Sequence, residues 1–91
     1  MNDSFQVKIQ TPEGVVWEGD VQALSSRNSM GSFDILPDHA NIITLVEGEP
    51  ISVVTATGSR EFKFDRAIIS VKDNVAAVYA EIAVKQSDIT K

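Results

Sequence analysis

Apolar and polar residues alternate with a period of two along most of this chain, which is the pattern of β-strands with one buried face. Phe5, Val7 and Ile9 alternate with polar neighbours near the start. Over residues 60–65, charged residues alternate with the rings of Phe62 and Phe64. No stretch of about 12 residues before the tail shows the 3.6-residue period of a helix. The pattern therefore predicts an all-β protein.

Short apolar runs mark the other predicted strands, and glycine, proline or polar pairs separate them. These runs lie at residues 15–17, 21–24, 33–36, 42–46, 51–56, 67–71 and 75–80. The breaks recur about every 8–12 residues, which is the spacing of an antiparallel sandwich or barrel. We expect one domain over residues 1–91, with no linker and no internal repeat.

The composition is that of a small globular domain without covalent staples. A chain of 91 residues forms one domain, and its 43 % hydrophobic content is too high for a disordered segment. Because the sequence has no cysteine, it cannot form a disulfide, a thiolate nucleophile or a zinc–thiolate site. Stability must therefore come from a hydrophobic core or from a partner.

The charge of the chain is acidic and unevenly distributed. A net charge of -5 argues against nucleic acid as a partner. Between Ile9 and Ser59, Arg27 is the single basic residue among seven acidic ones. This distribution indicates either a solvated surface that keeps the domain soluble or a surface that meets a basic partner. No apolar run is long enough to span a bilayer and the first residues do not resemble a signal peptide, so we expect an intracellular, soluble chain.

Candidate chemistry is limited to one short turn. Pro37, Asp38 and His39 form this turn, and His39 is the only histidine. A histidine beside a carboxylate of Asp38 or Asp34 can act as a general base. The nearby hydroxyl groups that could serve as nucleophiles belong to Ser29, Ser32 and Thr44. One histidine with scattered aspartates falls short of the ligand set of a metal site, and no glycine-rich phosphate loop is present. We therefore expect no catalytic site, metal, nucleotide or other cofactor.

Two large apolar residues lie near predicted turns. Trp17 is predicted to plug the end of the sandwich, the alternative being a surface anchor for a partner. Met30, next to Gly31, is predicted to be either exposed or covered by a partner. The phenylalanines are expected in the core.

The segment 31–40, Gly-Ser-Phe-Asp-Ile-Leu-Pro-Asp-His-Ala, resembles a family signature. It is similar to Gly-Glu-Phe-Gly-Ile-Leu-Pro-Gly-His-Ala of the epsilon subunit of F-type ATP synthases (delta in mitochondria). Residues 9–14, 17–19, 42–44 and 75–81 also resemble that family, so the similarity covers nearly the whole chain. The resemblance implies a flattened antiparallel β-sandwich of about ten strands, in agreement with the period of two.

The resemblance also implies a function. It implies a non-catalytic rotor subunit in the central stalk of a proton-translocating ATP synthase, which couples the gamma subunit to the c-ring. Such a subunit lies at the cytoplasmic face of the bacterial inner membrane, peripherally and through the complex only. The implied c-ring contacts are Met30, Gly31 and Ser32, and the implied gamma-subunit contacts are His39, Ala40, Asn41, Ile42 and Thr44.

Three departures from the family are visible in the sequence. Ser32 replaces the family's acidic residue after the signature glycine. Asp34 and Asp38 replace glycines, which aspartate tolerates if those positions need a positive φ. The family's C-terminal helical hairpin would begin near Asp88, so we expect the hairpin to be absent and the tail at 83–91 to be too short to replace it.

Each hypothesis makes a structural prediction. A stalk subunit requires an exposed apolar patch on one sandwich edge for gamma. A free-standing sandwich that binds a small ligand or sugar requires a pocket lined by Trp17 or Tyr79 with convergent polar groups. A small hydrolase requires His39 within hydrogen-bond reach of a serine or threonine hydroxyl.

Overall fold

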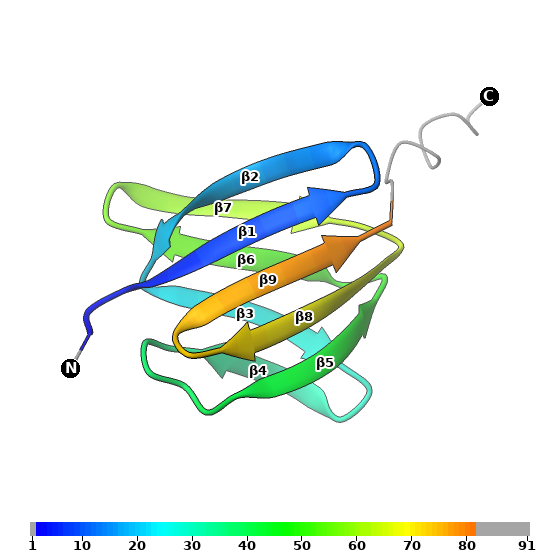
Figure 1. Ribbon diagram of the computed structural model, residues 1–91. Helices are drawn as coiled ribbons and strands as arrows, with labels where there is room; N and C mark the ends of the chain where they lie inside the picture. Colours follow the sequence, from blue (N-terminus) through cyan, green and yellow to red (C-terminus); the bar gives the residue numbers. More distant parts are fainter. Residues whose placement is uncertain (1, 82–91) are drawn as a thin grey trace.

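The computed structural model describes residues 2–81, which form two β-sheets stacked face to face (Figure 1). The five-stranded sheet has the order β2-β1-β9-β8-β5. Its strands are β1 (Phe5–Thr11), β2 (Gly14–Val21), β5 (Ile42–Glu47), β8 (Arg66–Lys72) and β9 (Val75–Ala80). The four-stranded sheet has the order β4-β3-β6-β7, formed by β3 (Ala23–Asn28), β4 (Gly31–Ile35), β6 (Pro50–Thr55) and β7 (Gly58–Lys63).

The predicted all-β sandwich is confirmed, with corrections to the strands. The described residues contain nine strands rather than about ten. All pairs are antiparallel except β1 and β9, which are parallel. Two parallel neighbouring strands need a crossover connection. Here the chain between β1 and β9 forms all four strands of the other sheet before β9 pairs with β1.

The strand predicted over residues 21–24 was wrong, because the chain changes sheets there. Val21 ends β2 in one sheet, and Leu24 lies in β3 of the other. Between them, the Gln22 amide donates a hydrogen bond to the Val54 carbonyl oxygen at 2.6 Å. Val21 and Leu24 are both fully buried, so residues 21–24 look like one strand in the sequence although they connect the two sheets.

The core lies between the sheets and contains no buried polar side chain among the described residues. Phe5 and Phe64 are buried in it, and Phe33 and Phe62 pack against it, as predicted. One row of the five-stranded sheet runs across the inner face in register: Trp17, Ile9, Val78, Ile69 and Thr44. The three central members of this row are fully buried.

The two ends of this row close the edges of the sandwich. Trp17 packs against the Phe62 ring on β7, with the ring centroids 6.0 Å apart. At the other edge, Asn28 Nδ2 on β3 donates a hydrogen bond to Thr44 Oγ1 at 2.9 Å. Trp17 is therefore a packing residue rather than a projecting anchor, as predicted, but it closes the edge of the sandwich rather than its end.

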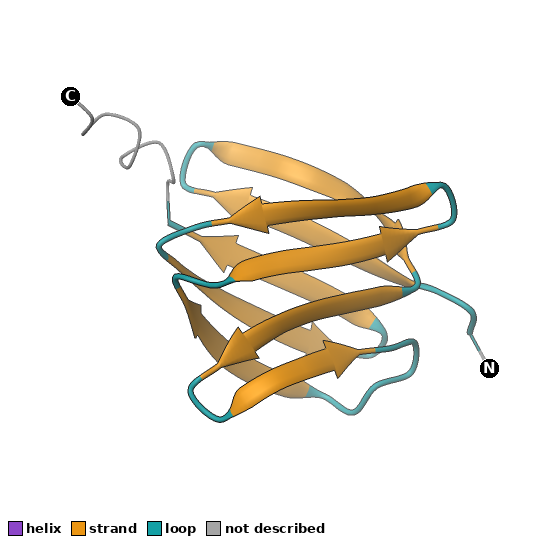
Figure 2. Ribbon diagram, turned by 180° about the vertical axis from the view of Figure 1, so that it is seen from behind, coloured by secondary structure: helices purple, strands orange, loops and turns teal. Residues whose placement is uncertain are grey.

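Viewed from behind, the two sheets remain separate layers, with the loops at the ends of the strands (Figure 2). No helix among residues 2–81 is long and apolar enough to cross a membrane. The expectation for the tail at 83–91 lies outside the described residues.

Candidate protein–protein interface

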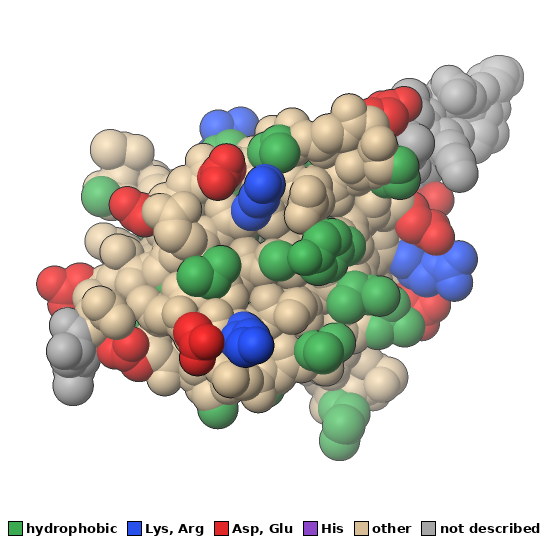
Figure 3. Space-filling model, viewed as in Figure 1, with side chains coloured by type: hydrophobic (Ala, Val, Ile, Leu, Met, Phe, Trp, Pro, Cys, Tyr) green, Lys and Arg blue, Asp and Glu red, His purple; other side chains and the backbone are tan. Residues whose placement is uncertain are grey.

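The outer face of the five-stranded sheet carries a group of exposed apolar side chains, which we call the outer patch. It consists of Ile43 and Leu45 on β5, Ile68 on β8 and Tyr79 on β9, which are 76 %, 47 %, 46 % and 53 % exposed. The strand register places Leu45, Ile68 and Tyr79 side by side across three neighbouring strands. Figure 3 shows apolar side chains gathered over these strands. Contiguous exposed apolar side chains of this kind mark interaction surfaces, whereas single ones do not.

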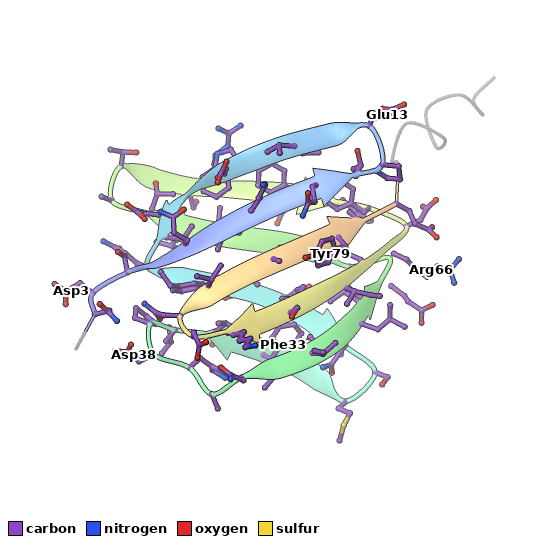
Figure 4. The ribbon with its side chains drawn as sticks, viewed as in Figure 1. Asp3, Glu13, Phe33, Asp38, Arg66 and Tyr79 are labelled. Carbon is purple, nitrogen blue, oxygen red and sulfur yellow. The ribbon has the colours of Figure 1, made fainter. Side chains whose placement is uncertain are left out.

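A groove of about 660 Å³ opens at one end of the outer patch. Leu45, Ile68 and Tyr79 line it together with Pro12. At its rim, Arg66 Nη2 and Glu81 Oε2 form an ion pair at 3.2 Å (Figure 4 shows Arg66 and Tyr79). Arg66 and Glu81 neutralise each other, and most of the other residues that line the groove are apolar. The groove therefore suits an apolar side chain of a protein partner better than a sugar, which needs convergent polar groups.

The loop that carries His39 lies between β4 and β5. The His39 ring contacts its neighbour, with Nδ1 2.7 Å from the Ala40 carbonyl oxygen. The hydroxyl of Ser32 accepts a hydrogen bond from Arg27, and that of Thr44 accepts one from Asn28. No hydrogen bond of the described residues joins His39 to a hydroxyl group, so the arrangement required of a hydrolase is not present there. The described residues also contain no group of three or more potential metal ligands.

Met30 occupies the turn between β3 and β4, at the other end of β4 from the His39 loop (Figure 1). Its side chain is 92 % exposed. Gly31 follows at φ 124°, a conformation that side-chain-bearing residues rarely adopt. The neighbouring groove of about 400 Å³ is lined by Met30, Ile43 and two acidic residues, Glu47 and Glu49. This groove thus combines apolar atoms with two acidic side chains and with Arg27, which also lines it.

Comparison with known proteins identifies the family. Residues 4–86 match the family described as "ATP synthase, Delta/Epsilon chain, beta-sandwich domain". The chain belongs to this family.

Relatives of this beta-sandwich family include two curated proteins named "ATP synthase epsilon chain". The one from Clostridium botulinum (strain Alaska E43 / Type E3) is 31 % identical over 84 residues, and the one from a Nitratiruptor species is 29 % identical over 90 residues. The matches cover 91 % and 98 % of this chain. The chain spans 63 % and 70 % of the length of these relatives.

Two solved structures share the delta/epsilon sandwich fold. A chain of the Euglena gracilis mitochondrial ATP synthase (OSCP/F1/c-ring) matches with a TM-score of 0.80 and 13 % identity, covering 88 % of this chain and 52 % of that one. A chain of the Tetrahymena thermophila mitochondrial ATP synthase (central stalk/c-ring) matches with a TM-score of 0.74 and 14 % identity, covering 94 % and 71 %. At these identities the likeness establishes the fold alone.

Within this delta/epsilon sandwich, β5 presents two different faces. Ile42 and Thr44 are half-buried on its inner side, whereas Ile43 and Leu45 project outward. The family resemblance points to the inward pair as contacts, and it does not point to the outward pair or to Ile68 and Tyr79, which are the exposed ones. A signal was present, because a continuous apolar run in a strand with only one buried face must expose every second residue.

The hydrogen bonds of Asp38 predict a lowered pKa for its carboxyl group. Asn2 donates to its carboxylate from the backbone amide at 3.0 Å and from the side-chain amide at 2.8 Å. These two bonds, the backbone one first, hold the pKa of the Asp38 carboxyl below its ordinary value. Because the folded pKa is lowered, the contact is fully present above the ordinary pKa of about 3.9 and is lost as the pH falls through the lower, folded pKa.

An NMR titration of the Asp38 carboxyl carbon checks this prediction. We expect a midpoint below the ordinary aspartate value in the native chain. The Asn2→Pro variant lacks both donors, so its midpoint should rise toward that value. Identical midpoints in the two proteins would show that Asn2 does not bind the carboxylate in solution.

Proposed function

We propose that this chain acts as a non-catalytic subunit of the central stalk of a proton-translocating F-type ATP synthase. Family membership supports this proposal, as do the names of the two relatives. The observation that carries it is the outer patch with its groove, because a protein that transmits force through contacts needs an apolar surface for its partner. The subunit would lie on the cytoplasmic side of a bacterial inner membrane, peripherally and through the complex.

We further propose that the gamma subunit covers the outer patch and extends along β5 to the His39 loop. Ile43 and Leu45 project from β5, which is the edge strand of its sheet. His39, Ala40 and Asn41, which the family resemblance implies as gamma contacts, directly precede this strand. One partner that follows β5 would therefore cover both the loop and the patch. Ile42 and Thr44 would act by supporting this edge from its inner side.

The c-ring contact belongs, in this proposal, to the turn formed by Met30, Gly31 and Ser32. The exposed thioether of Met30 gives this turn an adaptable apolar contact. Ser32 cannot supply the negative charge of the family's acidic residue, and its hydroxyl is bound by Arg27. Glu47 and Glu49, which line the adjoining groove, supply negative charge for a basic partner loop.

Binding to the gamma subunit from the same cells tests the proposed function. The full chain, mixed with purified gamma, should form a complex that persists through size-exclusion chromatography and gives a calorimetric affinity. A folded chain that fails to bind gamma would contradict the stalk role. In that case, binding of small apolar or sugar ligands in the Tyr79 groove should be measured next.

Reversing the charges of Glu47 and Glu49, in the groove beside Met30, tests the c-ring contact separately. Since an exposed ion pair contributes about 0.2–1 kcal/mol, the double variant Glu47→Lys and Glu49→Lys should weaken binding to isolated c-rings about tenfold at low salt. The loss should shrink at high salt, because screening weakens exposed charge pairs. The control is Glu13→Lys with Glu61→Lys, which makes the same change in net charge on other parts of the surface. Equal losses in both double variants would indicate a long-range effect of net charge instead of contact at this groove.

A further inference from the structure

The His39 loop is tied to two other segments that are distant in the sequence. As described above, Asn2 binds the Asp38 carboxylate with both of its amide groups. The Asp38 amide in turn donates to Asn74 Oδ1, in the turn between β8 and β9, at 2.6 Å. Asn74 Nδ2 then donates to the carbonyl oxygen of Ser4 at 3.0 Å, which links that turn back to the N-terminal segment. These bonds form a closed arrangement of three segments, which we call the terminal clamp.

A second bond anchors the loop on the other side of His39. The Asp73 amide donates to Asn41 Oδ1 at 3.0 Å. Asp38 and Asn41 are therefore both held by the turn at Asp73 and Asn74, and His39 and Ala40 lie between the two anchors. Figure 4 shows Asp38 at the same end of the molecule as Asp3, away from Arg66 and Glu13.

Three residues at this end of the molecule have a left-handed backbone conformation that suits their side chains. Asp38, Asp73 and Asn74 have φ values of 64°, 51° and 66°. This left-handed region favours glycine, and among other residues it favours asparagine and aspartate. Asp38 is thus a tolerated replacement for the family's glycine, and its side chain gains a partner that glycine could not have. Asp34, the other replacement, lies within β4 and does not have a positive φ.

The anchored loop leaves His39 with one defined hydrogen-bonding group for a partner. A carbonyl oxygen can only accept, so the bond to Ala40 requires that Nδ1 carries the hydrogen. In the neutral ring, Nε2 is then an acceptor. No described residue binds Nε2, so this atom is available to accept a hydrogen bond from a donor outside the chain.

We propose that Asn2 and Asn74 are positioning residues, which hold Asp38 so that His39 presents Nε2 to a hydrogen-bond donor on the gamma subunit. This inference rests on the proposed function and extends it to the N-terminal segment. Ordering the loop before binding removes part of the entropy cost of association. The clamp acts on the partner only through the loop, so its loss should weaken binding without unfolding the sandwich.

The test compares clamp variants with a neighbouring control in the full chain. Asn2→Pro removes both donors to Asp38, while Asp38→Gly and Asn74→Gly keep the positive φ accessible and remove the side-chain groups. Asp3→Asn is the control, because Asp3 is exposed and makes no hydrogen bond to the described residues. Amide exchange of residues 38–42, thermal melting and affinity for gamma are measured on each variant.

We expect faster exchange in the loop and about fivefold to tenfold weaker gamma binding for each clamp variant, with little change in melting and no effect of Asp3→Asn. Unchanged exchange, or faster exchange with unchanged affinity, would overturn the proposal while leaving the stalk role intact. Failure of the native chain to bind gamma would instead reject the proposed function, and the positioning role with it.

Discussion

Replacing Ile68 with aspartate is expected to abolish gamma binding while leaving the sandwich folded. Ile68 lies at the centre of the outer patch, between Leu45 and Tyr79 in the strand register. In the free chain, the new carboxylate is solvated, because the side chain at this position is 46 % exposed. In the proposed complex, the same carboxylate would be covered by apolar surface, and the nearest cation in the groove, Arg66, is already paired with Glu81. Burying an unpaired charge and losing the isoleucine contact together cost about 3 kcal/mol or more, which is a loss of affinity of about a hundredfold or greater.

The matched control for this variant is Val54→Asp. Val54 is also an exposed β-branched residue on an interior strand, 40 % exposed, but it lies on β6 of the other sheet. Both variants introduce one charge into a strand, so any effect on folding should be similar and is checked by circular dichroism and thermal melting. Calorimetry with gamma then separates the two faces. Loss of binding with Val54→Asp and not with Ile68→Asp would place the interface on the four-stranded sheet and contradict our assignment.

The sequence pattern was sufficient to predict the fold because burial and strand period are tightly coupled. Phe5, Val7 and Ile9 alternate inward in β1 as their spacing predicts. The pattern did not predict the change of sheet at Gln22, where residues 21–24 look like one strand. The buried residues on both sides of Gln22 look alike in the sequence whether they belong to one sheet or to two. The parallel pairing of β1 with β9 was also missed, since strand order depends on the path of the whole chain.

The candidate interface was less predictable than the fold. The signature around His39 drew attention to a loop, and the structure adds that this loop is anchored by Asn2 and Asn74, which are 36 residues away from Asp38 on either side. Contacts over such separations have no local sequence signal. The outer patch is assembled from two residues of β5 and one residue each of β8 and β9. The alternation within a strand shows which of its residues are exposed, but it does not show which exposed residues of different strands are neighbours. Only the register places Leu45, Ile68 and Tyr79 together.

Truncating Ile9 to alanine is expected to cause the largest loss of stability among the substitutions considered. Ile9 is fully buried and lies in register with Trp17 on one side and Val78 on the other. Its removal would leave a cavity where β1 meets the central strand β9, and such truncations lower the free energy of unfolding by about 2–5 kcal/mol. Small domains have a total of about 5–15 kcal/mol, so the loss is a large fraction. Chemical denaturation monitored by Trp17 fluorescence measures it.

Ile43→Ala provides the comparison, because Ile43 is 76 % exposed and its truncation should change the free energy of unfolding by no more than about 0.5 kcal/mol. A loss below about 1 kcal/mol for Ile9→Ala would mean that the core relaxes around the cavity and is not closely packed. The two substitutions at Ile9 and Ile68 also separate folding from binding. In the proposed assembly gamma binds only the folded sandwich, so adding it should raise the melting temperature of Ile9→Ala by mass action. It should not raise that of Ile68→Asp, whose core is intact but whose interface is lost.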